Sequence, residues 1–249
     1  MFTVEQFFEV LLTTGERTDD GLRLPTERDL AERTGLSRAT VREHLSALRV
    51  MGLLTKTQGS ANVLHVPSEE SSAAIYRVLL QMRHATLADV AEAREMFEIG
   101  MIPFVCRRIE DVDLDRLSTQ VTLMAAASRA GDLDAAIDAD LAFHRLLFES
   151  LHNPIVDFAF GGMRVSLRDV LAVRRAEALS AEMALNNGQA PTCYVTDSVH
   201  DHIVDALRAR EPRAATAAMT LHYDQFRDLV ARSEDLGLAA ITPTPRRNS

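Results

Sequence analysis

The chain has 249 residues, of which 47% are hydrophobic and 25% are charged, and its net charge is −9. This length allows one large domain or two modest ones, and the composition is that of a globular protein. No apolar run approaches the roughly 18 residues of a membrane span and no basic secretory segment begins the chain, so we expect a cytoplasmic protein without a membrane role.

The acidic net charge does not exclude DNA binding, because only the contacting face of a protein needs to be basic. Residues 1–66 carry eight Lys/Arg and nine Asp/Glu, so the excess of acid lies further along the chain. Within residues 36–51, Arg38, Arg42 and Arg49 stand against Glu43 alone. Such a local basic stripe favours a DNA-binding regulator over a protein that coats DNA non-specifically.

The first part of the chain predicts three helices. Each combines an apolar face with a capping residue at its start, over residues 3–14, 26–33 and 37–51. A turn-rich stretch, TTGERTDDGLRLP, separates the first two helices, and Gly35 supplies a tight turn between the other two. This pair of helices with its turn has the layout of a helix-turn-helix.

A short hairpin is predicted after the third helix. The segments LLTKT and ANVLHV flank Gln58, Gly59 and Ser60, which is typical of two strands around a turn. We therefore assign residues 1–66 to a winged helix-turn-helix DNA-binding domain. The polar, proline-containing stretch that follows, residues 67–73, is the predicted linker.

The remainder of the chain has a helical period. It predicts seven helices, near residues 73–84, 87–109, 112–130, 132–151, 154–176, 196–210 and 212–235. Residues 177–195 contain Asn-Asn-Gly and proline and predict a loop with a helical turn, and residues 236–249 predict a disordered tail. The predicted fold is mainly α: a winged helix-turn-helix with a small β-hairpin wing, then an all-α antiparallel bundle of about seven helices over residues 74–235.

The third helix carries the candidate DNA-reading residues. Arg38 and Arg42 are four residues apart and share one exposed face, which begins in the first turn after the Ser37 cap. A recognition helix meets base edges at this point, and a guanidinium can bridge guanine O6 and N7 or bind a phosphate. Arg28 begins the preceding helix. The alternative is a solvated basic face on an ordinary helical hairpin, which the turn, the cap and the hairpin together disfavour.

Four residues of the C-terminal part form a candidate metal site. Asp140 and His144 are one helical turn apart and point the same way, which makes half of a divalent-metal site. His200 and His222 lie on apolar faces of two later helices, whereas His202 is predicted to face solvent. Burying this much polarity without a ligand would leave unpaired groups that cost about 1–3 kcal/mol each. The alternative is a polar core without a metal.

The segment LPTERDLAERTGLSRATVREHLSALRVMGLL resembles the DNA-binding domain of the GntR family of bacterial repressors. The resemblance implies DNA contacts from Arg28, Arg38 and Arg42, and a wing glycine at Gly59. We include Thr40, which lies between the last two arginines, in the DNA-binding set. The wing segment TQGSAN departs from the family, whose members often carry another basic residue beside that glycine.

The spacing of the aspartate and the three histidines, with EAREMFEIGMIPFVCRR and ALRAREPRAATAAMTLHY, resembles the FCD ligand-binding domain of the FadR subfamily. The resemblance implies that these four residues bind one divalent metal, zinc first, with nickel and manganese as alternatives. It also implies that Arg94 contacts the carboxylate of an effector. The long-chain acyl-CoA binders of the subfamily lack the four ligands, so their presence favours a small organic acid.

Arg94 also has a local reason to pair with an acid. It lies with Phe97 and Met101 on a largely apolar helix face, where an unpaired guanidinium is costly. Either an effector carboxylate or a neighbouring acid such as Glu98 would supply the partner. The sequence leaves both interpretations open.

The combined interpretation is a transcription repressor that a small carboxylate effector releases from DNA. One recognition helix reads too few bases for useful specificity, so we expect a homodimer on an inverted-repeat, double-stranded operator. A metal-dependent enzyme using the same Asp/His site is an alternative, but a hydrolase needs a general base near the metal-bound water, and none is evident. A direct metal sensor is the second alternative. We therefore predict that the protein is not an enzyme.

Overall fold

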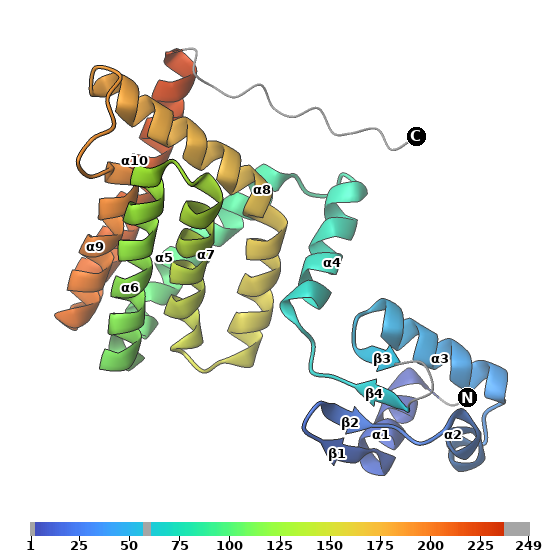
Figure 1. Ribbon diagram of the computed structural model, residues 1–249. Helices are drawn as coiled ribbons and strands as arrows, with labels where there is room; N and C mark the ends of the chain where they lie inside the picture. Colours follow the sequence, from blue (N-terminus) through green and yellow to red (C-terminus); the bar gives the residue numbers. More distant parts are fainter. Residues whose placement is uncertain (1–2, 57–60, 237–249) are drawn as a thin grey trace. The chain divides into compact units, whose positions relative to one another are not determined.

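The computed structural model describes residues 3–56 and 61–236, and it divides into two compact units, Met1–Val78 and Leu79–Ser249. Helices dominate both units, and the one small sheet of the described residues lies in the first (Figure 1). This arrangement confirms the predicted fold class. The division between Val78 and Leu79 comes later in the chain than the linker predicted at 67–73.

The first unit contains the three predicted helices of the DNA-binding domain and a fourth helix. Their bounds are α1 (Val4–Thr14), α2 (Glu27–Thr34), α3 (Arg38–Val50) and α4 (Glu69–Gln81). Thr3, Thr26 and Ser37 each cap the following helix by accepting a hydrogen bond from the backbone N–H three residues on. Gly35 ends α2 in the left-handed conformation, with φ 70°. The local sequence signals therefore set these helix ends.

Four short strands form one antiparallel sheet in the order β1-β2-β4-β3. Their bounds are β1 (Glu16–Thr18), β2 (Gly21–Arg23), β3 (Leu54–Lys56) and β4 (Asn62–Leu64). The pair β3–β4 confirms the predicted wing hairpin. The pair β1–β2 was not predicted, because three residues per strand are too few to show alternation and β2 is held by pairing with the distant β4.

Helix α4 begins inside the predicted linker, so residues 69–73 of that segment are helical. The Ser68 hydroxyl lies 3.4 Å from the Ser71 N–H, in the position of a helix cap. Glu69 and Glu70 place negative charge in the first turn, where the helix dipole favours it. The composition that suggested a connector is thus also that of a helix N-terminus.

The second unit is a bundle of six helices. Their bounds are α5 (Leu87–Arg108), α6 (Asp111–Ala130), α7 (Leu133–Glu149), α8 (Pro154–Leu185), α9 (Val195–Arg208) and α10 (Pro212–Asp235). Helix α10 packs against α5, α8 and α9, while α6 packs against α7 and α9. Figure 1 shows α6, α7 and α9 running alongside one another. Together with α4, these helices confirm the seven predicted after the connector.

Each unit has its own hydrophobic core. The core of the first unit gathers side chains from α1, α2, α3 and the sheet: Phe7, Leu11, Leu24, Leu30, Val41, Leu45, Leu48, Leu54 and Leu64. The core of the second unit is larger and includes Ile102, Leu117, Phe143, Leu147, Phe160, Ile203 and Met219. Because each such side chain contributes about 1.5–3 kcal/mol on burial, each core can fix the packing of its own helices.

Helix α8 is longer than the sequence predicted. Residues 177–185, expected to be loop, continue the helix, because EALSAEMAL consists mostly of strong helix formers. The Glu182 carboxylate accepts hydrogen bonds from the backbone N–H groups of Val195 and Thr196, at 2.5 and 2.9 Å. The last turns of α8 therefore fix the position of the N-terminus of α9, and α9 carries His200 of the candidate metal site.

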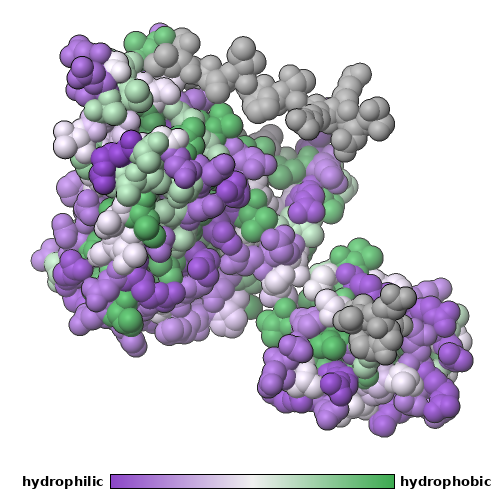
Figure 2. Space-filling model, viewed as in Figure 1, coloured by the Kyte–Doolittle hydropathy of each residue, from purple (hydrophilic) through white to green (hydrophobic). Residues whose placement is uncertain are grey.

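None of the described helices is both long and apolar enough to cross a bilayer. Figure 2 shows hydrophilic residues over most of the visible face, with hydrophobic side chains between them. The disordered tail predicted at residues 236–249 lies outside the described residues apart from position 236.

Two glycines of the second unit, one inside a helix and one at a helix end, provide a matched test of the assigned backbone conformations. A Cβ atom added to Gly100 or to Gly131 would meet nothing within 4 Å, but Gly131 has φ +73° and Gly100 lies within α5. We expect Gly100→Ala to raise the free energy of unfolding by up to about 1 kcal/mol. Gly131→Ala should lower it by about 1–2 kcal/mol, because a side chain strains the left-handed conformation. Urea denaturation measures both, and shifts in the same direction would contradict the assignment.

Candidate metal centre and DNA-contacting face

Three histidines that are far apart in the sequence meet inside the helical unit. His144 comes from α7, His200 from α9 and His222 from α10, and all three are buried. One ring nitrogen of each lies within 4.8 Å of the others. The ring centroids are 4.6 to 5.6 Å apart. The structure therefore brings together the histidines that the sequence grouped.

Two nitrogen atoms of these rings have no hydrogen-bond partner among the described residues. They are Nε2 of His144 and Nδ1 of His222, both buried, whereas Nδ1 of His144 lies 2.6 Å from Oε2 of Glu98 and Nε2 of His200 lies 3.4 Å from Oδ1 of Asp140. The Nδ1 atom of His200 lies 2.9 Å from the Asp197 carbonyl, and donation there leaves the Nε2 lone pair facing the other rings. Unpaired buried groups are costly, and a divalent cation accepts such lone pairs. The donor set thus fits a metal ion.

Asp140 lies beside the three histidines but is not within the same tight group. Its Oδ1 atom lies 3.4 Å from Nε2 of His200 and 3.3 Å from Nη1 of Arg175. Burial alone would raise the pKa of Asp140, but His200, His144 and Arg175 hold it well below its ordinary value. Asp140 is therefore an ionised carboxylate next to the histidines, as a metal ligand must be.

His222 is held in the form that binds metals. Burial lowers the pKa of His222 well below its ordinary value, and the neighbouring His200 and His144 lower it further. A neutral imidazole has a lone pair to donate, whereas a protonated one does not. His202, by contrast, is exposed on α9. The sequence placed both of these side chains correctly.

Glu98 supports the cluster from α5. Its Oε2 atom lies 2.6 Å from Nδ1 of His144, and its Oε1 atom accepts a 2.7 Å hydrogen bond from Nε of Arg94. Burial alone would raise the pKa of Glu98, but Arg94 and His144 lower it to about 2. A carboxylate behind a ligating histidine orients its ring and increases its basicity. The sequence considered Glu98 only as a partner of Arg94.

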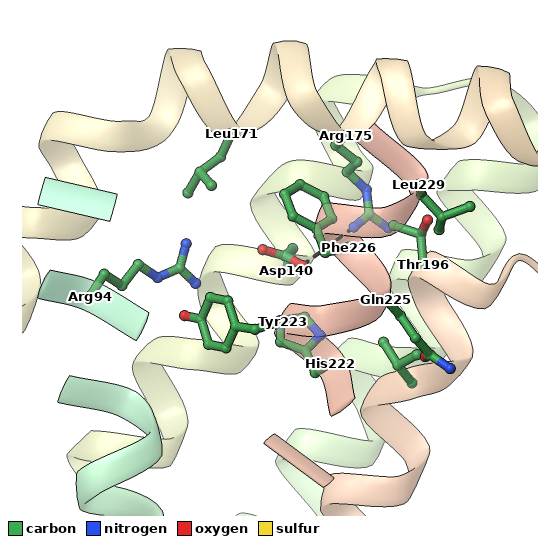
Figure 3. A pocket seen from close by; sticks show the side chains of 11 residues that line it. Arg94, Asp140, Leu171, Arg175, Thr196, His222, Tyr223, Gln225, Phe226 and Leu229 are labelled. Atoms are coloured by element: carbon green, nitrogen blue, oxygen red, sulfur yellow. Dashed lines mark hydrogen bonds and ion pairs between the residues drawn. The ribbon is translucent and has the colours of Figure 1, made fainter. Parts of the chain in front are cut away.

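Arg94 forms the salt bridge that the sequence offered as an alternative to an effector contact, and it also lines a cavity. The cavity has a volume of about 40 Å³, which is room for about three water molecules. Its polar walls include Asp140, Arg175, His222 and Tyr223. Figure 3 shows Arg94 and Arg175 reaching it from opposite sides, with Asp140 between them. The salt bridge to Glu98 therefore does not remove Arg94 from the site.

Arg175 is a site residue that the sequence analysis missed. It is only 2% exposed on α8, where its Nη2 atom pairs closely with Oδ1 of Asp197 and lies 3.4 Å from the Ser128 hydroxyl. Its neighbour Arg174 is exposed. In the sequence, two consecutive arginines therefore suggest a solvent-exposed helix face. The helical period could have indicated that Arg175 is buried, since it shares a helix face with Leu179 four residues later, which is also buried.

The predicted DNA-contacting residues lie in the first unit. Arg28, Arg38 and Arg42 are exposed on α2 and α3, while Thr40 stands 2.9 Å from the Ser37 hydroxyl that caps α3. Arg28 and Arg38 line one cleft together with Asn62 of β4. Arg42 donates a 3.1 Å hydrogen bond to Glu27. The structure thus gathers the basic side chains along one helix pair. The predicted wing glycine, at position 59, lies outside the described residues.

Comparisons with known proteins agree with both parts of this description. Residues 14–63 match the family of bacterial regulatory proteins, gntR family, and residues 89–225 match the FCD domain. The second match alone covers more than half of the chain. The chain belongs to the GntR family and carries an FCD domain. It is a transcription regulator.

The matches to three relatives, all named as transcriptional regulators or repressors, cover most of both chains. The uncharacterized HTH-type transcriptional regulator YcbG of Bacillus subtilis is 29% identical over 90% of this chain and 87% of its own. The HTH-type transcriptional repressor NanR of Cronobacter sakazakii is 28% identical over 88% and 80%, and LutR of Bacillus subtilis is 26% identical over 85% and 92%. These names confirm a DNA-binding regulator rather than an enzyme.

A solved structure supports the fold of this regulator. The Streptococcus agalactiae GntR structure has a TM-score of 0.64 and 25% sequence identity, covering 91% of this chain and 99% of its own. The match extends over nearly the whole of both chains.

The buried His222 makes the metal-free regulator sensitive to acid. Below about pH 6.5 the unfolded chain protonates at His222, whereas the folded protein, with its lowered pKa there, resists protonation. The unfolded state then binds more protons, so stability falls as the pH falls. Urea midpoints of chelator-treated protein at about pH 7.5 and about pH 5.5 measure this. We expect a smaller loss in His222→Gln, and an equal loss in both proteins would contradict the assignment.

Proposed function

We propose that this regulator is a metal-containing, FadR-like repressor that binds an inverted-repeat operator as a homodimer and is released by a small carboxylate effector. The single observation that carries the proposal is the cluster of buried imidazoles of His144, His200 and His222, in which Nε2 of His144 and Nδ1 of His222 have no hydrogen-bond partner. Such a cluster is costly as a structural core but suits a divalent cation. A relative named as a repressor supports the direction of regulation.

DNA recognition is assigned to the face that carries Arg28, Arg38, Thr40 and Arg42. The N-terminal turn of α3 presents Arg38, which is exposed and lines the cleft beside β4. In a helix-turn-helix this turn contacts base edges in the major groove. Because one such helix reads few bases, two copies on a symmetric site provide the specificity.

Replacing Arg38 with alanine tests this assignment. We expect operator binding to weaken by about 1–3 kcal/mol if Arg38 contacts a base, with relaxed preference at that position. Arg33→Ala is a matched control, because Arg33 is exposed in the last turn of α2 and not part of the cleft. Fluorescence anisotropy on DNA selected by the wild-type protein from a random pool measures both. An Arg38→Ala protein with wild-type sequence discrimination would refute the assignment.

The metal site is assigned to Asp140, His144, His200 and His222, with Glu98 supporting His144. A bound divalent ion would supply a Lewis-acidic coordination position for an effector oxygen. The cavity that contains Asp140 and His222 also exposes Arg94, so a small acid can meet both the metal position and a guanidinium. The volume of this cavity favours a small acid over a long acyl chain.

Metal content tests the site directly. We expect zinc-exposed wild-type protein to retain about one equivalent of metal, and His144→Ala and His222→Ala to lose it together with the metal-induced rise in melting temperature. His202→Ala is the matched control, because His202 is an exposed histidine of α9. Elemental analysis and thermal unfolding measure these changes. Equal metal in all variants would show that the cluster is only a polar core.

Effector binding can release DNA only if it favours one arrangement of the DNA-binding domains over another. By linkage, the effector must lower operator affinity by the same factor as the operator lowers effector affinity. Titrating both ligands against the zinc-loaded protein measures the two factors. If zinc alone changes operator affinity to the same extent, the metal is itself the signal and the protein is a direct metal sensor.

A further inference from the structure

The cleft of the DNA-contacting face has an acidic residue in its wall. Glu27 is the first residue of α2, and it lines this cleft together with Arg28 and Arg38. Because DNA phosphates are anionic, a carboxylate at this place weakens the general attraction between the protein and DNA. The presence of Glu27 among the arginines therefore needs a reason other than charge.

Glu27 is held in place by its own helix. The Thr26 hydroxyl accepts a hydrogen bond from the Asp29 N–H and caps α2, so Glu27 lies in the first helical turn. The helix dipole favours a negative charge there. The Glu27 side chain is only 21% exposed. Glu27 is thus an anion with a defined position at the edge of the cleft.

The partner of this carboxylate is Arg42 of α3. Its Nε atom donates a 3.1 Å hydrogen bond to Oε2 of Glu27. The Arg42 side chain is 62% exposed, so without this contact it would sample many rotamers. The Nη1 and Nη2 atoms of Arg42 make no hydrogen bond to any residue that the structure describes. The contact at Nε therefore restricts the guanidinium and leaves its two outer nitrogen atoms available.

The other two arginines of the face are not held in this way. The guanidinium of Arg28 lies 3.6 Å from Asp29 and 3.9 Å from Glu32, which is beyond hydrogen-bonding distance. Arg38 lines the cleft and forms no ion pair within the described part of the chain. Among these arginines, Arg42 is the one whose direction the protein itself sets.

We infer that Glu27 is a positioning residue for DNA recognition: it directs Arg42 so that Nη1 and Nη2 meet O6 and N7 of a guanine in the major groove. Two donors in one plane match these two acceptors. Glu27 therefore increases the sequence preference of the regulator while it weakens the general attraction to DNA. This inference rests on the proposed DNA-binding face.

The test uses the opposite signs of these two effects. In Glu27→Ala, we expect affinity for the operator to fall about three- to tenfold, because Arg42 is no longer directed. Affinity for a scrambled duplex of the same length should rise, because one negative charge is removed from the face. Fluorescence anisotropy at one salt concentration measures both, with DNA selected by the wild-type protein as the operator. Selection by Glu27→Ala from a random pool should show a weaker guanine preference at one position of each half-site.

Two controls separate positioning from charge. Glu43→Ala removes an exposed acid of α3 next to Arg42, and it should tighten binding to the operator and to the scrambled duplex alike. In an Arg42→Ala background, Glu27→Ala should cause no further loss of operator affinity, because no guanidinium is left to direct. Glu27→Gln serves where the alanine variant fails to fold. It has the same shape without the charge and should show the same changes to a smaller extent.

The inference is overturned if Glu27→Ala tightens binding to both kinds of DNA, as a purely electrostatic role requires. It is also overturned if the loss of operator affinity persists in the Arg42→Ala background, or if the guanine preference is unchanged. An Arg42→Ala protein with wild-type operator affinity would overturn it too. If Arg38→Ala also binds the operator as wild type does, the proposed DNA-binding face itself is refuted.

Discussion

The cost of burying unpaired imidazole nitrogens is the constraint on which the C-terminal unit depends. Three helices, α7, α9 and α10, each contribute one histidine to the same point in the bundle, and Nε2 of His144 and Nδ1 of His222 have no hydrogen-bond partner among the described residues. Hydrophobic packing alone would fill this space with Leu or Phe, as it does elsewhere in the core. The arrangement is best explained by a ligand whose binding free energy offsets the cost of burying these nitrogens.

The surrounding charges follow from the same constraint. Asp140 and Glu98 lie next to imidazole rings, and each carboxylate is in turn paired with an arginine, Asp140 of α7 with Arg175 of α8 and Glu98 with Arg94 of its own helix, α5. The Glu98–His144 contact joins α5 to α7 and the Asp140–Arg175 pair joins α7 to α8, while Glu182 fixes the start of α9. A change at the centre of the cluster therefore alters side-chain contacts on most helices of the bundle. This connectivity gives a small ligand a physical means of biasing the bundle between two arrangements.

The sequence predicted those features that depend on neighbours in the chain. The caps at Thr26 and Ser37, the turn at Gly35 and the inward phase of His200 and His222 could all be inferred from local patterns. The strands β1 and β2 could not, since they depend on pairing with a distant strand. The continuation of α8 was obscured by the turn residues that follow it. The roles of Glu98 and Arg175 were missed because both are decided by partners on other helices, and sequence spacing does not reveal such partners.

The most direct test of the account is the coordination shell of the zinc-loaded protein, measured by X-ray absorption at the zinc edge. The account predicts imidazole nitrogens from three histidines and carboxylate oxygen, at about 2.0–2.2 Å, with the outer-shell scattering of histidine rings. The two cysteines, Cys106 and Cys193, should contribute nothing. A sulfur shell near ~2.3 Å, or a shell without histidine scattering, would contradict the account.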